Sequence, residues 1–236
     1  FNPLKFGFIG STDTHNATSG QVDEKSTNGN YGNWDVYPDK RLDYTKPFVE
    51  FNMNWMNPGG LAAVWAEENT RESIYAALKR RESFATSGPR IMIKFFAQKN
   101  DSTDPCTVAD GLKGVPMGGE IKNRLGKPRF VVQALRDKVN LSRIEIVKAS
   151  LVDGKVKLKI IKLPSESPAG APELCRAWVD EEYLPNQHAY WYARAFQIET
   201  PRWSKYACES ENLCDEYPEL DKMIEERAWA SPIWNL

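Results

Sequence analysis

The sequence contains little histidine, no closely spaced cysteine pair, no long apolar run and no excess of one charge. Two of its 236 residues are histidine and four are cysteine. Cys106, Cys175, Cys208 and Cys214 show no CxxC spacing, which argues against a thiolate zinc knuckle. The even number permits two disulfides, and the short loop between Cys208 and Cys214 is easily closed. Free thiols explain the sequence equally well.

These absences narrow the classes of function. The 31 basic and 32 acidic residues give a net charge of −1 and are scattered, which argues against nucleic acid as a partner. No apolar stretch approaches the roughly 20 residues of a membrane span, and no secretory signal segment is present. The chain begins with Phe1 rather than methionine. We interpret it as a processed or truncated product of a longer protein.

The first part of the chain, residues 1–89, is predicted to be α/β. The apolar runs at 4–10 and 60–66 are typical of short buried strands. Between them lies a long loop, 16–59, rich in Asn, Gly, Asp and Pro but also in aromatic residues. Loops of this length in a compact domain are usually binding loops or disordered inserts, and the aromatic residues favour an ordered loop.

A helix is predicted over residues 69–81. Asn69 is the expected N-cap, and Glu72, three residues later, can reach back to the cap amide. Three residues at helical spacing form an apolar face: Ile74, Ala77 and Leu78. Basic residues follow at the end where the helix dipole favours cations.

The second part, residues 90–236, is predicted to be an antiparallel β-sandwich, because apolar residues there alternate with polar ones. Strands are expected at 90–97, 129–136, 141–149, 155–162 and 189–198. A helix is expected at 216–227 and an edge strand at 231–234. Asp153–Gly154 has the composition of a tight hairpin turn. In the strand that follows this turn, Val156, Leu158 and Ile160 are expected to face the core.

The stretch GFIGSTDTHNATSG, residues 7–20, carries the clearest candidate chemistry. If the chain is extended there, Asp13 and His15 project to the same side with Cα atoms about 6.5 Å apart. A carboxylate and an imidazole suit Zn, Mn or Fe, and Thr12, Thr14 and Asn16 can hydrogen-bond the ligands' free edges. The alternative is an ordinary polar turn that contains a histidine.

This stretch resembles the last metal-binding motif of the polymerase and histidinol phosphatase (PHP) superfamily, in which a strand ends in a Gly-Ser-Asp-x-His type sequence. The downstream run NPGGLAAVWAEENTRESIYAALKRRESFATSGPRIMIKFF is similar to the signature of a PHP-like family, DUF3604. The resemblance extends from residue 5 to the ASPIW segment near the end of the chain.

The resemblance implies the C-terminal portion of a PHP-type distorted α/β barrel, followed by the β-rich region. It also implies a cluster of two to three metal ions, Zn, Mn or Fe, that hydrolyses phosphoesters or related small-molecule esters with a metal-bound hydroxide. Asp13 and His15 would be metal ligands. The family's opening His-x-His motif and its intervening ligands are absent. We therefore expect a missing N-terminal part to supply them, this chain to be inactive alone, and a periplasmic or secreted location.

Other residues have two interpretations each. Glu67 and Glu68 can hydrogen-bond the metal ligands or act as a general base. Alternatively, they are simply acidic residues favoured at a helix N-terminus. Arg71 can meet an anionic substrate or lie exposed on the helix. Trp34 and Tyr37 can stack on a substrate ring or pack the loop. His188 precedes a strand and is interpreted as a surface or structural histidine.

Two functions of different classes follow. The first is a metal-dependent, phosphoesterase-like hydrolase, which requires Asp13 and His15 to converge with further ligands. The second is a non-catalytic β-sandwich that binds carbohydrate or protein, which requires a solvent-facing aromatic strip on the strands. A serine hydrolase built on Ser11 and His15 is excluded, because the sequence has no G-x-S-x-G elbow.

Overall fold

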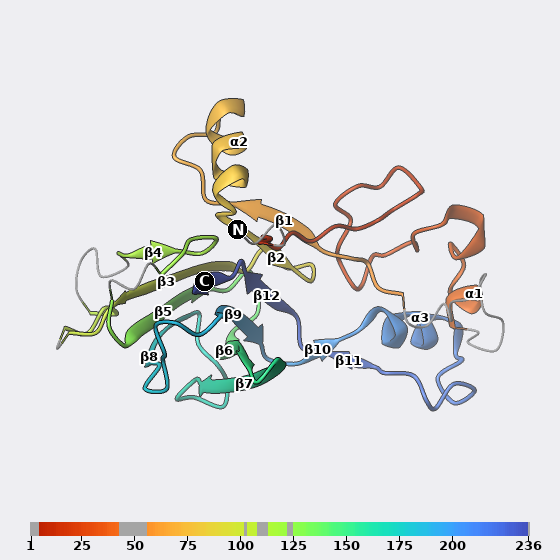
Figure 1. Ribbon diagram of the computed structural model, residues 1–236. Helices are drawn as coiled ribbons and strands as arrows, with labels where there is room; N and C mark the ends of the chain where they lie inside the picture. The colour runs from red at the N-terminus through yellow and green to blue at the C-terminus, as the bar shows by residue number, and fades with distance from the viewer. Residues whose placement is uncertain (1–4, 43–55, 102, 108–112, 122–124, 236) are drawn as a thin grey trace.

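Two antiparallel sheets packed face to face form the larger part of the molecule (Figure 1). The computed structural model describes residues 5–42, 56–101, 103–107, 113–121 and 125–235. Every ladder between named strands is antiparallel. The structure therefore confirms a β-rich antiparallel fold, and the described residues contain no parallel strands of an α/β barrel.

The larger sheet has the strand order β1-β2-β12-β9-β6-β7, with β13 also paired to β9. Its strands are β1 Leu61–Val64, β2 Ser83–Thr86, β6 Leu141–Val152, β7 Lys155–Pro164, β9 Ala189–Gln197, β12 Arg227–Ala230 and β13 Ile233–Asn235. The smaller sheet has the order β4-β3-β5-β8. Its strands are β3 Met92–Lys99, β4 Val115–Pro116, β5 Pro128–Leu135 and β8 Glu173–Val179.

The core lies between these two sheets. Alternate residues of β3 are buried because one face of the strand meets the larger sheet. Phe130 of β5 packs on Trp191 of β9, with ring centroids 4.8 Å apart. A hairpin joins β6 to β7, and its turn residues Asp153 and Gly154 have φ of 49° and 72°, as a two-residue turn with left-handed residues requires. The predicted hairpin is confirmed.

Three apolar side chains of β7, Val156, Leu158 and Ile160, do not face the core as predicted, whereas Ile161 and Leu163 pack against it. Val156, Leu158 and Ile160 are 68%, 67% and 51% exposed. The strand lies at the end of the strand order, and no other layer of the described residues covers this face. The alternation identified the strand correctly, but it could not show that a core lies on that side.

A smaller part holds two helices and a short ladder, seen beside the sheets in Figure 1. It contains a 3-10 turn Gly32–Trp34, α1 Pro38–Leu42, β10 Thr200–Pro201, α3 Trp203–Glu211 and β11 Met223–Ile224. A separate core joins α1 to α3: Leu42, Trp203, Ala207, Cys208 and Leu220 are buried together. The Pro38–Leu42 part of the 16–59 loop thus packs on a C-terminal helix; the loop's residues 43–55 lie outside the described ranges.

Three predicted elements differ from the structure. Residues 5–10 form no strand, although they run beside β1 and β2. The helix expected at 216–227 is absent, because Met223 and Ile224 pair with β10 as strand β11 and β12 begins at Arg227. The helix of this region is α3, Trp203–Glu211, which was not predicted. Helix α2, Arg71–Arg80, is confirmed, but its N-cap is Thr70, whose side chain accepts a hydrogen bond from the Ser73 amide.

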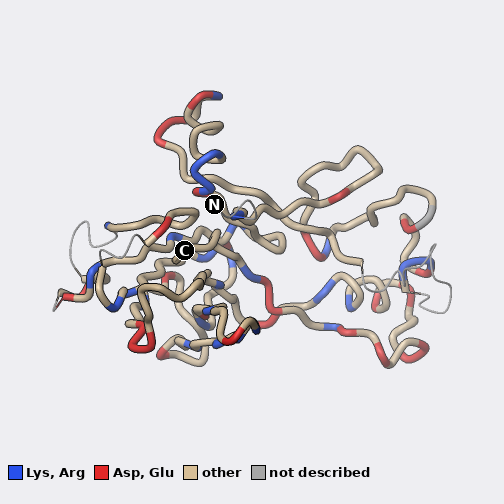
Figure 2. The backbone as a smooth tube through the Cα atoms, viewed as in Figure 1, with Lys and Arg blue, Asp and Glu red and all other residues tan. Residues whose placement is uncertain are grey.

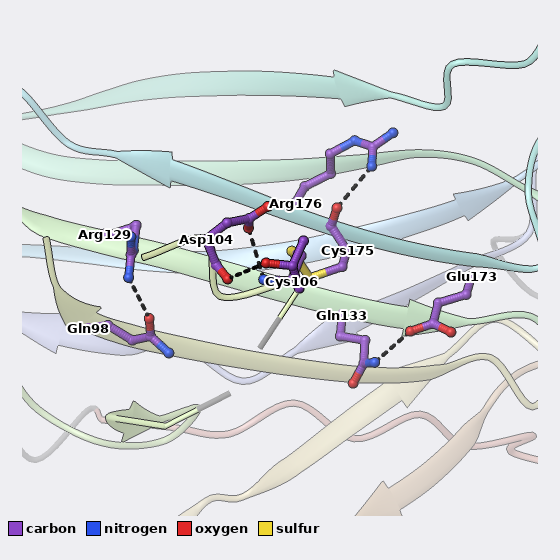
Figure 3. The surroundings of a disulfide bond; sticks show 9 residues. Gln98, Asp104, Cys106, Arg129, Gln133, Glu173, Cys175 and Arg176 are labelled. Carbon is purple, nitrogen blue, oxygen red and sulfur yellow. Dashed lines mark hydrogen bonds between the residues drawn. A yellow bond between two sulfur atoms is a disulfide. The ribbon is translucent and has the colours of Figure 1, made fainter. Parts of the chain in front are cut away.

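Both cysteine pairs form disulfides, Cys106 with Cys175 and Cys208 with Cys214. Figure 3 shows the first, which ties the segment after β3 to the outer strand β8. Basic and acidic residues are interspersed along the backbone (Figure 2). Among the described residues, no helix has the length and apolarity needed to cross a membrane.

Candidate functional site

Asp13 and His15 converge in the structure. The Asp13 Oδ1 and His15 Nε2 atoms are 3.6 Å apart, and the two side chains are 83% and 57% exposed. The chain is not extended there as predicted, because Asp13 adopts a left-handed φ of 48°. Asp tolerates this conformation better than most residues, and the resulting turn brings the two side chains together.

One contact of its ring and one of its backbone hold His15 in place. Its ring packs against Tyr31 with centroids 4.8 Å apart. Its backbone N–H donates to the Asn30 carbonyl at 2.7 Å. Asn30 is buried, and its side-chain amide donates to the Thr12 carbonyl at 3.2 Å. These contacts fix the backbone around the pair while its donor atoms stay open to solvent.

This pair fits a transition metal in kind and in spacing. A carboxylate oxygen and an imidazole nitrogen each bound at about 2.1 Å to one ion lie roughly 3–3.5 Å apart, close to the separation here. A catalytic zinc site needs about three protein ligands. Within the described ranges no group of three or more His, Cys, Asp or Glu side chains converges. The described residues therefore present two neighbouring donor side chains rather than a closed site.

The predicted supporting residues stabilise the turn itself. Asn16 accepts hydrogen bonds from the hydroxyls of Thr14 and Thr18 and donates to the Gly29 carbonyl at 2.8 Å. Thr12 is buried and bonds Asn30 through its carbonyl. Thr12, Thr14 and Asn16 thus hold the loop that carries the pair, and their bonds run to the loop rather than to the two ligand side chains.

Two glycines fix this segment against the larger sheet. A Cβ on Gly59 would lie 2.4 Å from the Thr12 Cα atom, and one on Gly60 would lie 2.1 Å from the Thr86 carbonyl oxygen. The Gly60 amide also donates to the Ser11 carbonyl at 2.8 Å. The NPGG sequence therefore allows the close backbone contact that positions Asp13 and His15.

The structure does not bring the other predicted residues to this pair. Glu67 and Glu68 are exposed and follow the end of β1, whereas Gly59 and Gly60, which contact the Asp13 segment, precede its start. Arg71 is exposed on α2, which projects from the sheets in Figure 1. Tyr37 is 58% exposed, and the Lys40 ammonium group lies over its ring. His188 is also exposed. The side chain of Trp34 lies outside the described residues.

A pair of carboxyl groups, Glu24 and Glu226, was not predicted. Glu226 is 2% exposed and accepts a hydrogen bond from the Ser87 hydroxyl. Glu24 accepts one from the Trp203 amide at 2.5 Å. The pKa of Glu24 is raised to about 7, mainly by burial and also by the neighbouring Glu226, against the opposing hydrogen bond from Trp203. Burial also raises the pKa of Glu226. No local sequence signal marks these two glutamates, which are distant in the chain.

This acid pair makes stability depend on pH. The folded-state pKa of Glu24 lies above its ordinary 4.5, so the folded protein binds more protons than the unfolded one between about pH 4.5 and 7. We expect the free energy of unfolding to fall by the order of 2 kcal/mol as the pH rises through this window. Denaturant unfolding at about pH 5 and pH 8 measures this change. Glu24→Gln removes the titrating group, and an unchanged pH dependence in that variant would contradict the assignment.

A cavity of about 500 Å³ lies beside the Asp13 segment and reaches Glu24 of the acid pair. Its volume is typical of sites for small molecules. The described residues that line it are Phe8, Ile9, Gly10, Ser11, Glu24, Asn57, Gly59, Gly60, Ala85, Thr86, Ser87, Tyr192, Ile224 and Trp229. They come from the N-terminal segment, the 16–59 loop and four strands, so only the folded chain brings them together.

Comparison with known proteins gives one match. A family model described as "Protein of unknown function (DUF3604)" matches residues 1–167 and 162–236, which together span the chain. No curated protein and no solved structure matches.

Proposed function

The chain belongs to the DUF3604 family, and on this basis we propose that it contributes Asp13 and His15 to the metal site of a PHP-type, phosphoesterase-like hydrolase. The observation that carries the proposal is the convergence of the two side chains, with Oδ1 and Nε2 3.6 Å apart. The loop contacts of Asn30 and Asn16 support it, because they hold the turn without using either donor atom.

Asp13 and His15 would hold Zn, Mn or Fe, as their oxygen and nitrogen donors suit these metals. When bound, such an ion activates water and offsets the negative charge of an ester undergoing hydrolysis. The chain's own part is to orient the ligands. Tyr31 limits the rotation of the imidazole ring, and the exposed faces of Asp13 and His15 leave room for a further ligand and a substrate.

The remaining ligands, two to three metal ions and the rest of a barrel would come from a longer form of the protein. This proposal follows from the ligand count, because one pair cannot close a catalytic site. The substrate would be a small-molecule ester or phosphoester, and the chain alone would be inactive. Two disulfides support a periplasmic or secreted location, since such bonds persist in oxidising compartments.

The hydrolase proposal predicts that His15→Ala lowers phosphodiesterase activity of the longer form by about 100-fold or more, because a lost ligand removes most transition-state stabilisation by the metal. Initial rates with bis(para-nitrophenyl) phosphate, after loading with Zn, Mn or Fe, measure this. His188→Ala is the matched control, as His188 is exposed and distant in sequence from the pair. Equal losses in both variants, or no loss in His15→Ala, would refute the assignment.

A second candidate function rests on β7. The row of exposed side chains Val156, Leu158 and Ile160 favours a sandwich that binds another protein, since exposed apolar groups in a row mark interaction surfaces. This function requires no metal. If the wild-type protein retains its protein partner after treatment with a chelator, and the Leu158→Lys variant does not bind it, the result would favour protein binding over hydrolysis.

A further inference from the structure

The side chains that line the cavity of about 500 Å³ beside the Asp13 segment indicate which class of ligand would fit there. We propose that it binds an uncharged, flat aromatic ring that carries a hydroxyl group, such as an aryl alcohol. This inference does not depend on the metal site, because none of the cavity's described lining residues is Asp13 or His15.

Aromatic side chains form the walls. Tyr192 of β9 and Trp229 of β12 lie on the same face of the larger sheet, since Trp229 is paired with Arg194, two residues from Tyr192. Phe8 packs edge-on against Tyr192 with ring centroids 5.3 Å apart. Ala85 of β2, paired with Trp229, adds only a methyl group beside the indole. The small Ala85 side chain beside the Trp229 indole leaves a space suited to a flat ring.

The charge of the lining disfavours an anion. No lysine, arginine or histidine is among the described lining residues, and Glu24 is the only carboxyl group there. A negatively charged ligand would lose its hydration without gaining a cationic partner. Ser11, Ser87 and Asn57 instead offer neutral hydroxyl and amide groups that can exchange hydrogen bonds with a ligand hydroxyl.

Glu24 gives the polar end of the cavity a carboxyl group that stays protonated more readily than an ordinary one. Burial raises the pKa of Glu24 to about 7, and Glu226 lies against it while bonded to the Ser87 hydroxyl. Arg202 and Arg227 lie near Glu226 and lower its pKa against the effect of burial. Glu24 therefore presents a carboxyl group that can exchange a hydrogen bond with a ligand hydroxyl.

Two probes of similar size that differ in charge test this inference. Fluorine NMR would follow para-fluorobenzyl alcohol and para-fluorobenzoate with the intact chain at about pH 6, in the presence of a chelator so that no metal contributes. We expect the alcohol to bind at least about tenfold more tightly than the benzoate. Equal binding, or tighter binding of the benzoate, would overturn the proposal.

Variants then locate the site. Ala85→Leu fills the cavity beside Trp229, and Trp229→Ala removes a wall, so each is expected to weaken binding of the alcohol by at least about tenfold. Glu24→Gln keeps a neutral side chain of the same shape and is expected to retain binding. Tyr75→Ala on α2 is the control, because Tyr75 is an exposed aromatic residue outside the cavity. If Ala85→Leu folds with an unchanged circular dichroism spectrum and still binds the alcohol like the wild type, the cavity is not the site.

Discussion

Replacing Asp180 with alanine is expected to lower the free energy of unfolding by about 3–5 kcal/mol, because it leaves a buried lysine without a counter-charge. Asp180 is fully buried and Lys148 is 4% exposed. The Lys148 Nζ atom lies 2.7 Å from Asp180 Oδ2. The Trp191 indole N–H also donates to Oδ2 at 3.0 Å, and the Glu182 amide donates to Oδ1 at 3.2 Å.

This cluster joins the two sheets. Asp180 follows β8 of the smaller sheet, whereas Lys148 and Trp191 belong to β6 and β9 of the larger one. Loss of the carboxylate removes the ion pair and leaves the indole N–H unpaired at the same time. Asp180→Asn keeps an acceptor for the indole, so it is expected to cost less than alanine.

Urea unfolding of Asp180→Ala, Asp180→Asn and Glu181→Ala measures these differences. Glu181 is the matched control, since it follows Asp180 directly but forms an exposed pair with Lys127 at 2.6 Å. Exposed pairs contribute less than about 1 kcal/mol. A loss of the same size in Glu181→Ala and Asp180→Ala would contradict the burial argument.

Removing the disulfide between Cys106 and Cys175 is expected to cost about 4 kcal/mol. The two cysteines are separated by 69 positions, and a cross-link that closes a long loop restricts the unfolded chain strongly. The bridge also anchors the segment after β3, where Asp104 accepts a hydrogen bond from the Cys106 amide at 2.9 Å (Figure 3). The Cys106→Ser, Cys175→Ser double variant tests this by denaturant unfolding.

The second disulfide is the internal control. Cys208 and Cys214 are separated by 6 positions, so the chain-entropy argument gives a cost of about 2 kcal/mol for their removal. We therefore expect the Cys208→Ser, Cys214→Ser variant to lose about half as much stability. A larger loss from the short loop than from the long one would show that strain or packing, rather than loop closure, dominates.

The sequence predicted the structural elements whose formation depends on residues close to one another along the chain. Alternation and the Asp153–Gly154 turn identified the β6–β7 hairpin, because both are encoded within one short stretch. The capping and periodicity of α2 likewise placed it to within one or two residues. The sequence also indicated Asp13 and His15 as a pair, although they converge through a left-handed turn rather than along an extended chain.

The features that the sequence did not reveal depend on distant contacts. Whether the apolar face of β7 is buried depends on what lies over it, which alternation does not encode. The strands β2 and β8 are short or interrupted by charged residues, and their pairing partners define them. The Glu24–Glu226 pair joins a loop to the turn before β12, so its raised pKa values arise only in the folded chain.

The predicted boundary between the two regions, at residues 89 and 90, remains a prediction. β1 and β2 lie before it, yet β2 is hydrogen-bonded to β12 near the end of the chain. The larger sheet therefore includes strands from both sides of the boundary. An α/β barrel in the longer form would have to extend from, or pack against, this shared sheet.

Metal content is the most direct test of the claim that Asp13 and His15 are metal ligands. Elemental analysis would compare the longer form of the protein with its His15→Ala and His188→Ala variants, each purified without added chelator. We expect about two or three Zn, Mn or Fe ions per chain in the wild type and in His188→Ala, and a clear depletion in His15→Ala. A wild type without metal, or the same metal content in all three proteins, would contradict it.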